Sequence, residues 1–328
     1  MNKIDPSLVT NRFRRLRRTK VIRDLVRETH ISKDDLILPL FIEEDIDKKS
    51  ELKTMPGVYR YPESELAEVV QRVWKKGIKA VMLFGVSHHK DATGSDSCID
   101  AGLMARIIRI AKQAQPEMLV ISDNCFCEYT DHGHCGVIVD GDVHNDQTLV
   151  NLQQQAVVAA RAGADMIAPS GMMDGMIAAI RAALDENDFH HIPIMSYSTK
   201  FASAFYGPFR DAVDVHLKGT RDGYQLDKAN RREALAESLQ DEAEGADLLM
   251  VKPATAYLDV VSDIRANSLL PLAVYHVSGE YAMIKIAAAN GAIDERAIVM
   301  ETMISFKRAG ADLVLTYFAE QIADWLNE

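Results

Sequence analysis

The hydrophobic residues of this chain gather in eight short runs, each followed by a longer segment of mixed polarity. Each run is a continuous stretch of four to eight hydrophobic residues rich in Val, Ile, Leu and Met. Strands that are buried on both faces of a parallel sheet have this pattern. We therefore predict eight strands, at 36–42, 80–86, 119–125, 165–171, 193–199, 247–253, 271–277 and 313–319.

The segments between these runs have the spacing of amphipathic helices. In residues 146–163, for example, Leu149, Leu152 and Ala156 fall on one helical face, and Asp146 is the expected N-cap. Similar joints lead from helix to strand, each with a glycine that can end the helix in the left-handed conformation. They read AGAD at 162–165, EGAD at 244–247, AGAD at 309–312 and, more loosely, KKGIKA at 75–80.

Eight strand–helix units with a repeated joint predict an α/β fold of the (β/α)₈ TIM-barrel type. A doubly wound open sheet is the alternative, because periodicity does not show whether the sheet closes. No G-x-G-x-x-G follows the first strand, which counts against that alternative.

The composition fits a globular protein of this size, with 328 residues, 48% hydrophobic and 26% charged. The longest uncharged run, 266–279, is shorter than the roughly 18 residues of a membrane span, so we expect no membrane insertion. No apolar segment follows the first charged residues, so we expect no secretory signal and a cytoplasmic protein. Cytoplasmic thiols stay reduced, which disfavours a disulfide.

Charge divides the chain into two parts. Residues 1–33 hold ten Lys/Arg against three Asp/Glu, whereas the whole chain has a net charge of −11. A basic arm could bind nucleic acid, but the acidic remainder would repel a phosphate backbone. We therefore predict an N-terminal arm at 1–33 that binds an acidic surface of this chain or of a neighbouring copy, followed by a barrel domain at 34–328.

A TIM barrel carries its chemistry at the carboxyl ends of its strands. Two lysines lie there, Lys200 just past the fifth predicted strand and Lys252 at the end of the sixth. Burial and mutual repulsion would both lower the pKa of such amines and free them to attack a carbonyl, as Schiff-base chemistry requires. The alternative is two lysines whose ammonium groups reach solvent. Other polar residues near strand ends are Asp123, Cys125, Ser170, Ser278 and Tyr317.

The segment that follows Lys200 is too long for a tight turn. Residues 201–212, FASAFYGPFRDA, are aromatic and contain Gly and Pro, which suits a lid over a substrate. Arg210 and Arg221 lie in or just past it and have the planar fork that binds carboxylates. Surface ion pairs are the alternative role for either arginine.

Three of the four cysteines lie within CFCEYTDHGHC, residues 125–135. Cys125, Cys127 and Cys135 would make a good zinc set, and three protein ligands leave a position open, as in catalytic sites. A closed structural site would need a fourth ligand, which His132 or His134 could supply. The remaining thiol, Cys98, is expected to be a packing residue.

Three long motifs together resemble the porphobilinogen synthase (5-aminolevulinate dehydratase) family: SDNCFCEYTDHGHCG, MSYSTKFASAFYGPFRDA and LLMVKPA. The resemblance extends over nearly the whole chain. It implies a lyase that condenses two molecules of 5-aminolevulinate into porphobilinogen, with loss of two waters, in haem and tetrapyrrole biosynthesis.

By position, the resemblance implies a Schiff base on Lys252, a second-substrate role for Lys200 and proton transfer by Asp123. It also implies two carboxylate sites, one formed by Ser278 and Tyr317 and the other by Arg210, Arg221 and Gln225. The three cysteines would bind a catalytic zinc, and Glu237 matches the position of a stimulatory magnesium site that some bacterial members carry. The family further implies a homo-oligomer, commonly an octamer, whose arm wraps a neighbour. Nucleic acid and membrane are not expected partners.

Two other functions would use only part of these residues. A class I aldolase on the same barrel needs one Schiff-base lysine and no metal, so it leaves the cysteine motif unexplained. A non-catalytic zinc protein would have a closed metal site and would leave Lys200 and Lys252 without a role.

Overall fold

The computed structural model describes residues 11–215 and 217–328. It contains a parallel strand at each of the eight predicted places, with both faces of nearly every strand buried. The strands are β1 (Leu36–Glu43), β4 (Ala80–Val86), β5 (Leu119–Asn124), β8 (Met166–Pro169), β9 (Met195–Lys200), β10 (Leu248–Lys252), β11 (Leu272–His276) and β12 (Leu313–Thr316).

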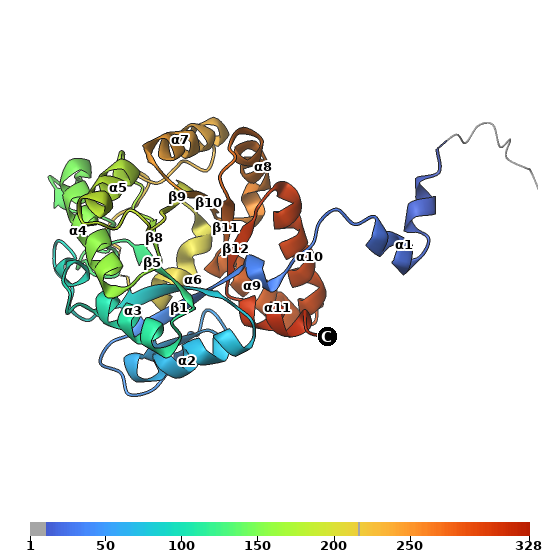
Figure 1. Ribbon diagram of the computed structural model, residues 1–328, viewed down its shortest axis with the longest axis horizontal. Helices are drawn as coiled ribbons and strands as arrows, with labels where there is room; N and C mark the ends of the chain where they lie inside the picture. Colours follow the sequence, from blue (N-terminus) through green and yellow to red (C-terminus); the bar gives the residue numbers. More distant parts are fainter. Residues whose placement is uncertain (1–10, 216) are drawn as a thin grey trace, which may run out of the picture.

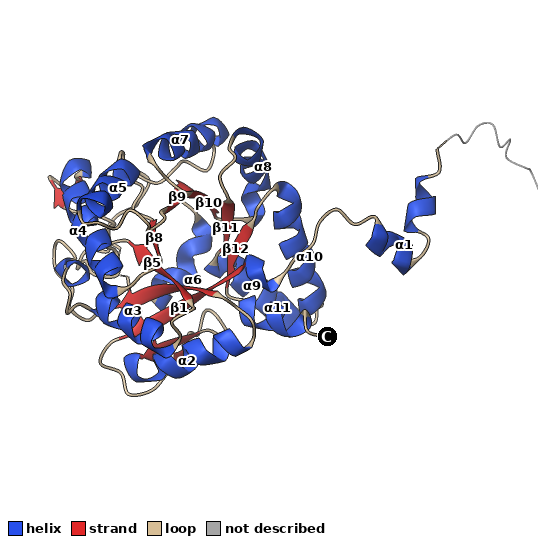
Figure 2. Ribbon diagram, viewed as in Figure 1, coloured by secondary structure: helices blue, strands red, loops and turns tan. Residues whose placement is uncertain are grey.

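These strands close into a barrel. Their order is β8-β5-β4-β1-β12-β11-β10-β9. The two ends of this series meet where the Ile167 amide donates to the Pro193 carbonyl at 3.0 Å, next to a parallel bridge between Ile167 and Ile194. Figure 2 shows the resulting ring of strands inside a layer of helices. The predicted (β/α)₈ barrel is confirmed, and the open doubly wound sheet is wrong.

The helices cover the outside of the ring in chain order (Figure 1). They bury one apolar face each against the strands, as their spacing predicts. The main helices are α2 (Glu63–Lys75), α3 (Leu103–Ala114), α4 (Asn145–Ala162), α5 (Met176–Glu186), α7 (Arg231–Glu244), α8 (Leu258–Asn267), α9 (Ser278–Ala289), α10 (Glu295–Ala309) and α11 (Ala319–Trp325).

The ends of these helices test two predictions. Four glycines at the helix-to-strand joints have positive φ, between 92° and 120°, which confirms the repeated cap. The expected N-cap of α4 is wrong: His144 is the cap, and its Nδ1 accepts from the Gln147 amide at 3.3 Å. Asp146 lies in the first turn instead, where its charge favours the positive end of the helix dipole.

Smaller elements lie at the carboxyl end of the barrel and in the connections between strands and helices. The pair β2 (Ser50–Glu51) and β3 (Tyr59–Pro62) adds to the edge of β1, and β6 (Ile138–Val139) pairs with β7 (Asp142–Val143). Short helical turns are η3 (Lys33–Asp35), η4 (Ser95–Cys98), η5 (Ala204–Tyr206), α6 (Gly207–Ala212) and η6 (Thr255–Tyr257).

The basic segment before the barrel extends away from it (Figure 1). Its described part forms η2 (Phe13–Arg17) and α1 (Lys20–Leu25), with large apolar side chains facing solvent: Phe13 is 73% exposed and Leu25 is 83% exposed. Residues 1–10 of the predicted arm lie outside the described residues. Across the described ranges, none of the helices is both long and apolar enough to span a bilayer.

A fully buried histidine lies in the wall of the barrel. His276 on β11 bonds through Nδ1 to the Thr316 hydroxyl at 3.1 Å, and its ring packs beside Phe306 and Phe318. Burial lowers its pKa from 6.5 to about 3. The folded protein therefore keeps this imidazole neutral at a pH where the unfolded chain protonates it.

This difference predicts an acid-sensitive fold. The stability that neutral His276 contributes is complete above pH 6.5 and is lost progressively as the pH falls toward 3. Between pH 7 and pH 5 we expect this group to lower the free energy of unfolding by about 2 kcal/mol. Urea unfolding at both pH values should show a smaller loss in His276→Gln than in the wild type. The same loss in both proteins would contradict the assignment, and the exposed His190→Gln serves as control.

Candidate active site

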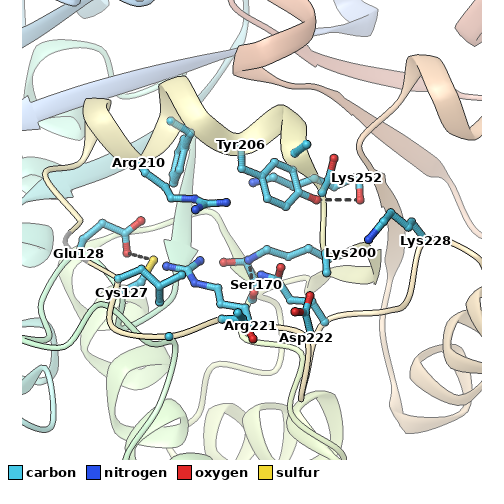
Figure 3. A pocket seen from close by; sticks show the side chains of 18 of the residues that line it. Cys127, Glu128, Ser170, Lys200, Tyr206, Arg210, Arg221, Asp222, Lys228 and Lys252 are labelled. Carbon is cyan, nitrogen blue, oxygen red and sulfur yellow. Dashed lines mark hydrogen bonds between the residues drawn. The ribbon is translucent and has the colours of Figure 1, made fainter.

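A cavity of about 270 Å³ opens at the carboxyl ends of the strands, where a TIM barrel is expected to carry its chemistry. Figure 3 shows charged side chains from several different strands and loops converging on it. The lining residues include Asp123, Cys127, Glu128, Ser170, Lys200, Arg210, Arg221, Gln225 and Lys252.

The two lysines lie side by side. Lys200 is the last residue of β9 and Lys252 the last of β10, and they are partners in the pairing of these strands. Their side chains are only 4% and 5% exposed. The prediction that neighbouring strands present two amines to one pocket is confirmed, and the alternative that they reach solvent is wrong.

Lys200 faces the cavity because of an irregularity in its strand. The pairing of β9 with β10 shifts by one residue between Leu249 and Val251. Within this bulge, Ser198 and Thr199 both turn outward and bond the Ser238 hydroxyl of α7, at 2.9 and 2.8 Å. Two consecutive outward residues return the next side chain, Lys200, to the inside.

Lys252 is surrounded by aromatic rings. Its Nζ lies 4.2 Å from the ring centre of Tyr275 and 5.0 to 5.3 Å from those of Phe209, Tyr197 and Tyr206. Burial, reinforced by the positive charge of Lys200, lowers the pKa of this amine to about 7. A substantial fraction of Lys252 is therefore a free amine near neutral pH.

Lys200 has a different environment. Its Nζ donates to the Ser170 carbonyl at 2.5 Å. Burial disfavours its charge, but the negative charge of Cys135 and Cys125 outweighs burial and raises its pKa. The expectation that both lysines have lowered pKa values is wrong for Lys200, because the cysteine cluster lies beside it. The cavity thus contains one nucleophilic amine and one ammonium.

Asp123 provides a carboxyl group next to both amines. It lies near the end of β5, is 5% exposed and accepts a bond from the Ser170 hydroxyl at 3.4 Å. Burial raises its pKa, against the opposing effect of Lys200 and Lys252. This arrangement suits a group that exchanges a proton with its neighbours.

The three predicted metal ligands come together. The sulfur atoms of Cys125, Cys127 and Cys135 lie within 4.8 Å of one another, and all three thiols are buried and free of disulfides. Three soft sulfur donors at this spacing fit zinc. Cys98 is separate and packs near the Asn151 carbonyl, as expected of a packing residue.

The histidines of the same loop do not complete a closed site. The His132 ring bonds the Ala92 carbonyl at 3.2 Å and the His134 amide at 3.1 Å. The His134 ring bonds the Tyr224 hydroxyl at 3.1 Å and the Lys218 carbonyl at 2.7 Å. Within residues 11–215 and 217–328, no His, Asp or Glu joins the three sulfurs as a fourth ligand at that spacing. The geometry is that of an open three-sulfur site.

Glu128 is a site residue that sequence reasoning missed. It is 2% exposed and lines the cavity, and its Oε2 accepts from the Cys127 thiol at 3.3 Å. Burial, together with the nearby Asp123 and Cys135, raises its pKa to about 7. The sequence did contain one signal for this role. Glu128 lies inside the cysteine motif, whose cysteines are predicted to lie at the cavity.

Three of the predicted carboxylate binders line the cavity: Arg210 on α6, Arg221 and Gln225. Arg221 donates to the Gly133 carbonyl at 2.8 Å. Its Nε and the Gln225 Nε2 are buried and have no hydrogen-bond partner within the described part of the chain. These donors are available to a bound carboxylate.

The other predicted pair, Ser278 and Tyr317, does not line this cavity. The Ser278 hydroxyl donates to the Phe205 carbonyl at 3.2 Å and accepts from the Phe209 amide at 3.0 Å. The Tyr317 hydroxyl bonds that of Tyr275, 2.9 Å away. Both residues thus contact groups next to Lys252 rather than the open space.

The predicted lid lies over Lys252. The turn η5 and the helix α6 form residues 204–212. Tyr206 and Arg210 face the cavity (Figure 3), and Phe209 also lines it. The Tyr206 hydroxyl donates to the Lys252 carbonyl at 3.1 Å, and Arg60 Nε donates to the Ala212 carbonyl at 2.8 Å. These bonds attach the middle of the lid to β10 and its last residue to β3.

Glu237 lies outside this cavity, on α7. It lines a second cavity of about 350 Å³, where burial and the nearby Asp174 and Glu233 raise its pKa. In the described ranges, no three carboxylate or histidine ligand atoms gather around it within 4.8 Å.

Comparison with known proteins points to one family. The sequence profile of the family described as Delta-aminolevulinic acid dehydratase matches residues 10–325. A protein of that name from Escherichia coli (strain K12) is 58% identical over 95% of this chain and 97% of its own. Another, from Halalkalibacterium halodurans, is 51% identical over 98% of both chains.

A solved structure agrees with these matches. The delta-aminolevulinic acid dehydratase (porphobilinogen synthase) of Toxoplasma gondii ME49, crystallised in complex with the reaction product porphobilinogen, has a TM-score of 0.94 and 44% identity to this chain. The match covers 96% of this chain and 91% of the other. The similarity therefore extends over the whole barrel rather than over single motifs.

Proposed function

This chain belongs to the delta-aminolevulinic acid dehydratase family of hydro-lyases, and we propose that it condenses two molecules of 5-aminolevulinate into porphobilinogen with loss of two waters. One observation carries the proposal: Lys200 and Lys252 are paired residues on neighbouring strands, and they lie beside three cysteine sulfurs. Two amines and an open metal site suit a reaction between two keto acids, whereas a class I aldolase would use one lysine.

Lys252 forms the Schiff base with the first substrate. Its free amine attacks the ketone carbon, the carbonyl oxygen leaves as water, and a C=N bond replaces the C=O bond. Lys200, an ammonium at neutral pH, engages the second substrate, and Asp123 moves protons between the two. The pKa of about 7 for Lys252 and the raised pKa of Lys200 support this division.

The substrate carboxylates bind at two places. Arg210, Arg221 and Gln225 hold that of the second substrate, which their position in the cavity and their unpaired donors support. Ser278 and Tyr317 hold that of the first. Because their hydroxyls bond the lid residue Phe209 and the ring neighbour Tyr275, this role requires the lid to shift when the first substrate binds.

Cys125, Cys127 and Cys135 bind zinc. When present, the metal supplies Lewis-acid polarisation of the second substrate's carbonyl or amine. The protein's own part is to keep the three sulfurs together, buried and next to Lys200, whose positive charge balances theirs.

The finer properties of the family carry over as proposals. We assign Glu237 to a stimulatory magnesium site, which its acidic surroundings support. The exposed apolar side chains of the basic arm support its docking on a second copy in a homo-oligomer, an octamer by family resemblance. The proposed location is the cytoplasm, and the proposed pathway is haem biosynthesis.

Direct turnover tests the proposal. Purified protein with zinc should convert 5-aminolevulinate into porphobilinogen, measured by the colorimetric reaction of the pyrrole. Below pH 7 we expect kcat/KM to fall about tenfold per pH unit, because protonation removes the free amine of Lys252. No product under any condition would overturn the function. Product with a rate that climbs steadily to pH 10 would overturn only the lowered pKa.

A further inference from the structure

One buried carboxylate oxygen in the cavity has no partner. Within the described residues, Glu128 Oε1 is buried and accepts no hydrogen bond, although the residue is only 2% exposed. Leaving such a group unsatisfied costs free energy, so buried acceptors are normally paired. The oxygen belongs to a residue that lines the cavity, and a bound molecule can therefore supply the missing donor.

The position of Glu128 in the cavity determines which of the two substrates it can contact. Its other oxygen, Oε2, lies 3.3 Å from the Cys127 sulfur, so the carboxylate lies beside the proposed metal site. Figure 3 shows Glu128 next to Cys127 and well separated from Lys252. Glu128 therefore borders the half of the cavity assigned to the second substrate.

The chemistry of the substrate leaves one group without a partner on the protein. In the proposed function, the lysines serve the ketones of 5-aminolevulinate, and the arginines and Gln225 serve its carboxylate. Whether zinc polarises the carbonyl or the amine of that substrate, the N–H bonds of the amino group need an acceptor. Asp123, the other buried acid in the cavity, already accepts the Ser170 hydroxyl and lies beside the lysines, whose charges act on it.

We propose that Glu128 is a specificity-determining residue, whose free oxygen accepts a hydrogen bond from the amino group of the second substrate. This inference rests on the proposed function, since it names the partner of one group of that substrate. Glu128 makes the cavity prefer an amino keto acid over the same acid without its amine, because an analogue lacking the donor leaves the oxygen unpaired.

Glu128→Gln tests the proposal, because the amide keeps the shape of the side chain but loses its charge. We expect KM for 5-aminolevulinate to rise about 10- to 100-fold, the range for a lost hydrogen bond between charged groups. The inhibition constant of 4-oxopentanoate, which lacks the amine, should change less than about threefold, within the scatter of such effects. Zinc content per chain should equal that of the wild type.

The control is Asp131→Asn, which removes a carboxylate from an exposed position of the same cysteine loop. It should leave both constants unchanged. The proposal is overturned if Glu128→Gln keeps the wild-type KM, if both constants rise equally, or if the variant loses zinc. A wild-type protein that forms no porphobilinogen would instead refute the underlying function, so the two failures are distinguishable.

Discussion

Lys252→Met is expected to reduce porphobilinogen formation by at least about 10⁴-fold, the scale of loss when a covalent nucleophile is removed. Methionine preserves the apolar stem that packs among Tyr206, Phe209 and Tyr275, so the fold should persist. The other buried amine in the cavity cannot replace it, because Lys200 is an ammonium that bonds the Ser170 carbonyl.

The covalent intermediate provides a second readout. Borohydride reduction in the presence of 5-aminolevulinate should add one substrate to the wild type at Lys252, detected by peptide mass spectrometry, and none to Lys252→Met. Lys228→Met is the matched control, because Lys228 also lines the cavity but is exposed. A Lys252→Met protein with near wild-type turnover, or an adduct located on Lys200 alone, would show that the nucleophile has been misassigned.

Removal of the metal should have the next largest effect. Chelation is expected to lower activity more than about 100-fold, and added zinc should restore it, because three sulfurs without their ion cannot polarise the substrate. Cys127→Ser should bind zinc more weakly and stay inactive at zinc concentrations that restore the chelated wild type. Metal analysis of the same samples links activity to zinc content.

Cys98→Ser is the control for thiol loss, since Cys98 lies outside the cluster. It should keep both zinc and activity. Full turnover after complete removal of zinc would keep the reaction but reduce Cys125, Cys127 and Cys135 to a structural role.

Much of the barrel was predictable because its strands are buried on both faces and therefore appear as continuous apolar runs. The same argument placed Lys200 and Lys252 in one pocket, since a polar residue directly after such a run lies at the carboxyl edge of the sheet. Barrel closure could not be read from these runs. It depends on contacts between residues 167 and 193–194, and local periodicity carries no information on them.

The missed features depend on how the fold arranges charged and polar groups around each residue. Glu128 is an acidic residue like many others until the fold encloses it between Cys127 and Asp123. The pKa of Lys200 was predicted with the wrong sign because only burial and the neighbouring lysine were considered, whereas the cysteine charges together outweigh burial. The closed lid, through Phe205 and Phe209, also separates Ser278 from the open cavity.

The bulge in β9 determines what a change in the length of this strand would do to the catalytic lysine. Side chains alternate along a strand with a period of two, so residues 196–200 without the bulge would turn the amine of residue 200 toward α7 and away from its partner on β10. Removal of Ser198 or Thr199 would instead restore plain alternation and keep that amine inside the barrel. Insertions in the surface loops do not change which side of the strand residue 200 faces. In the evolution or redesign of this chain, loop length should therefore vary freely, while the bulge in β9 should be lost only together with one residue of the strand.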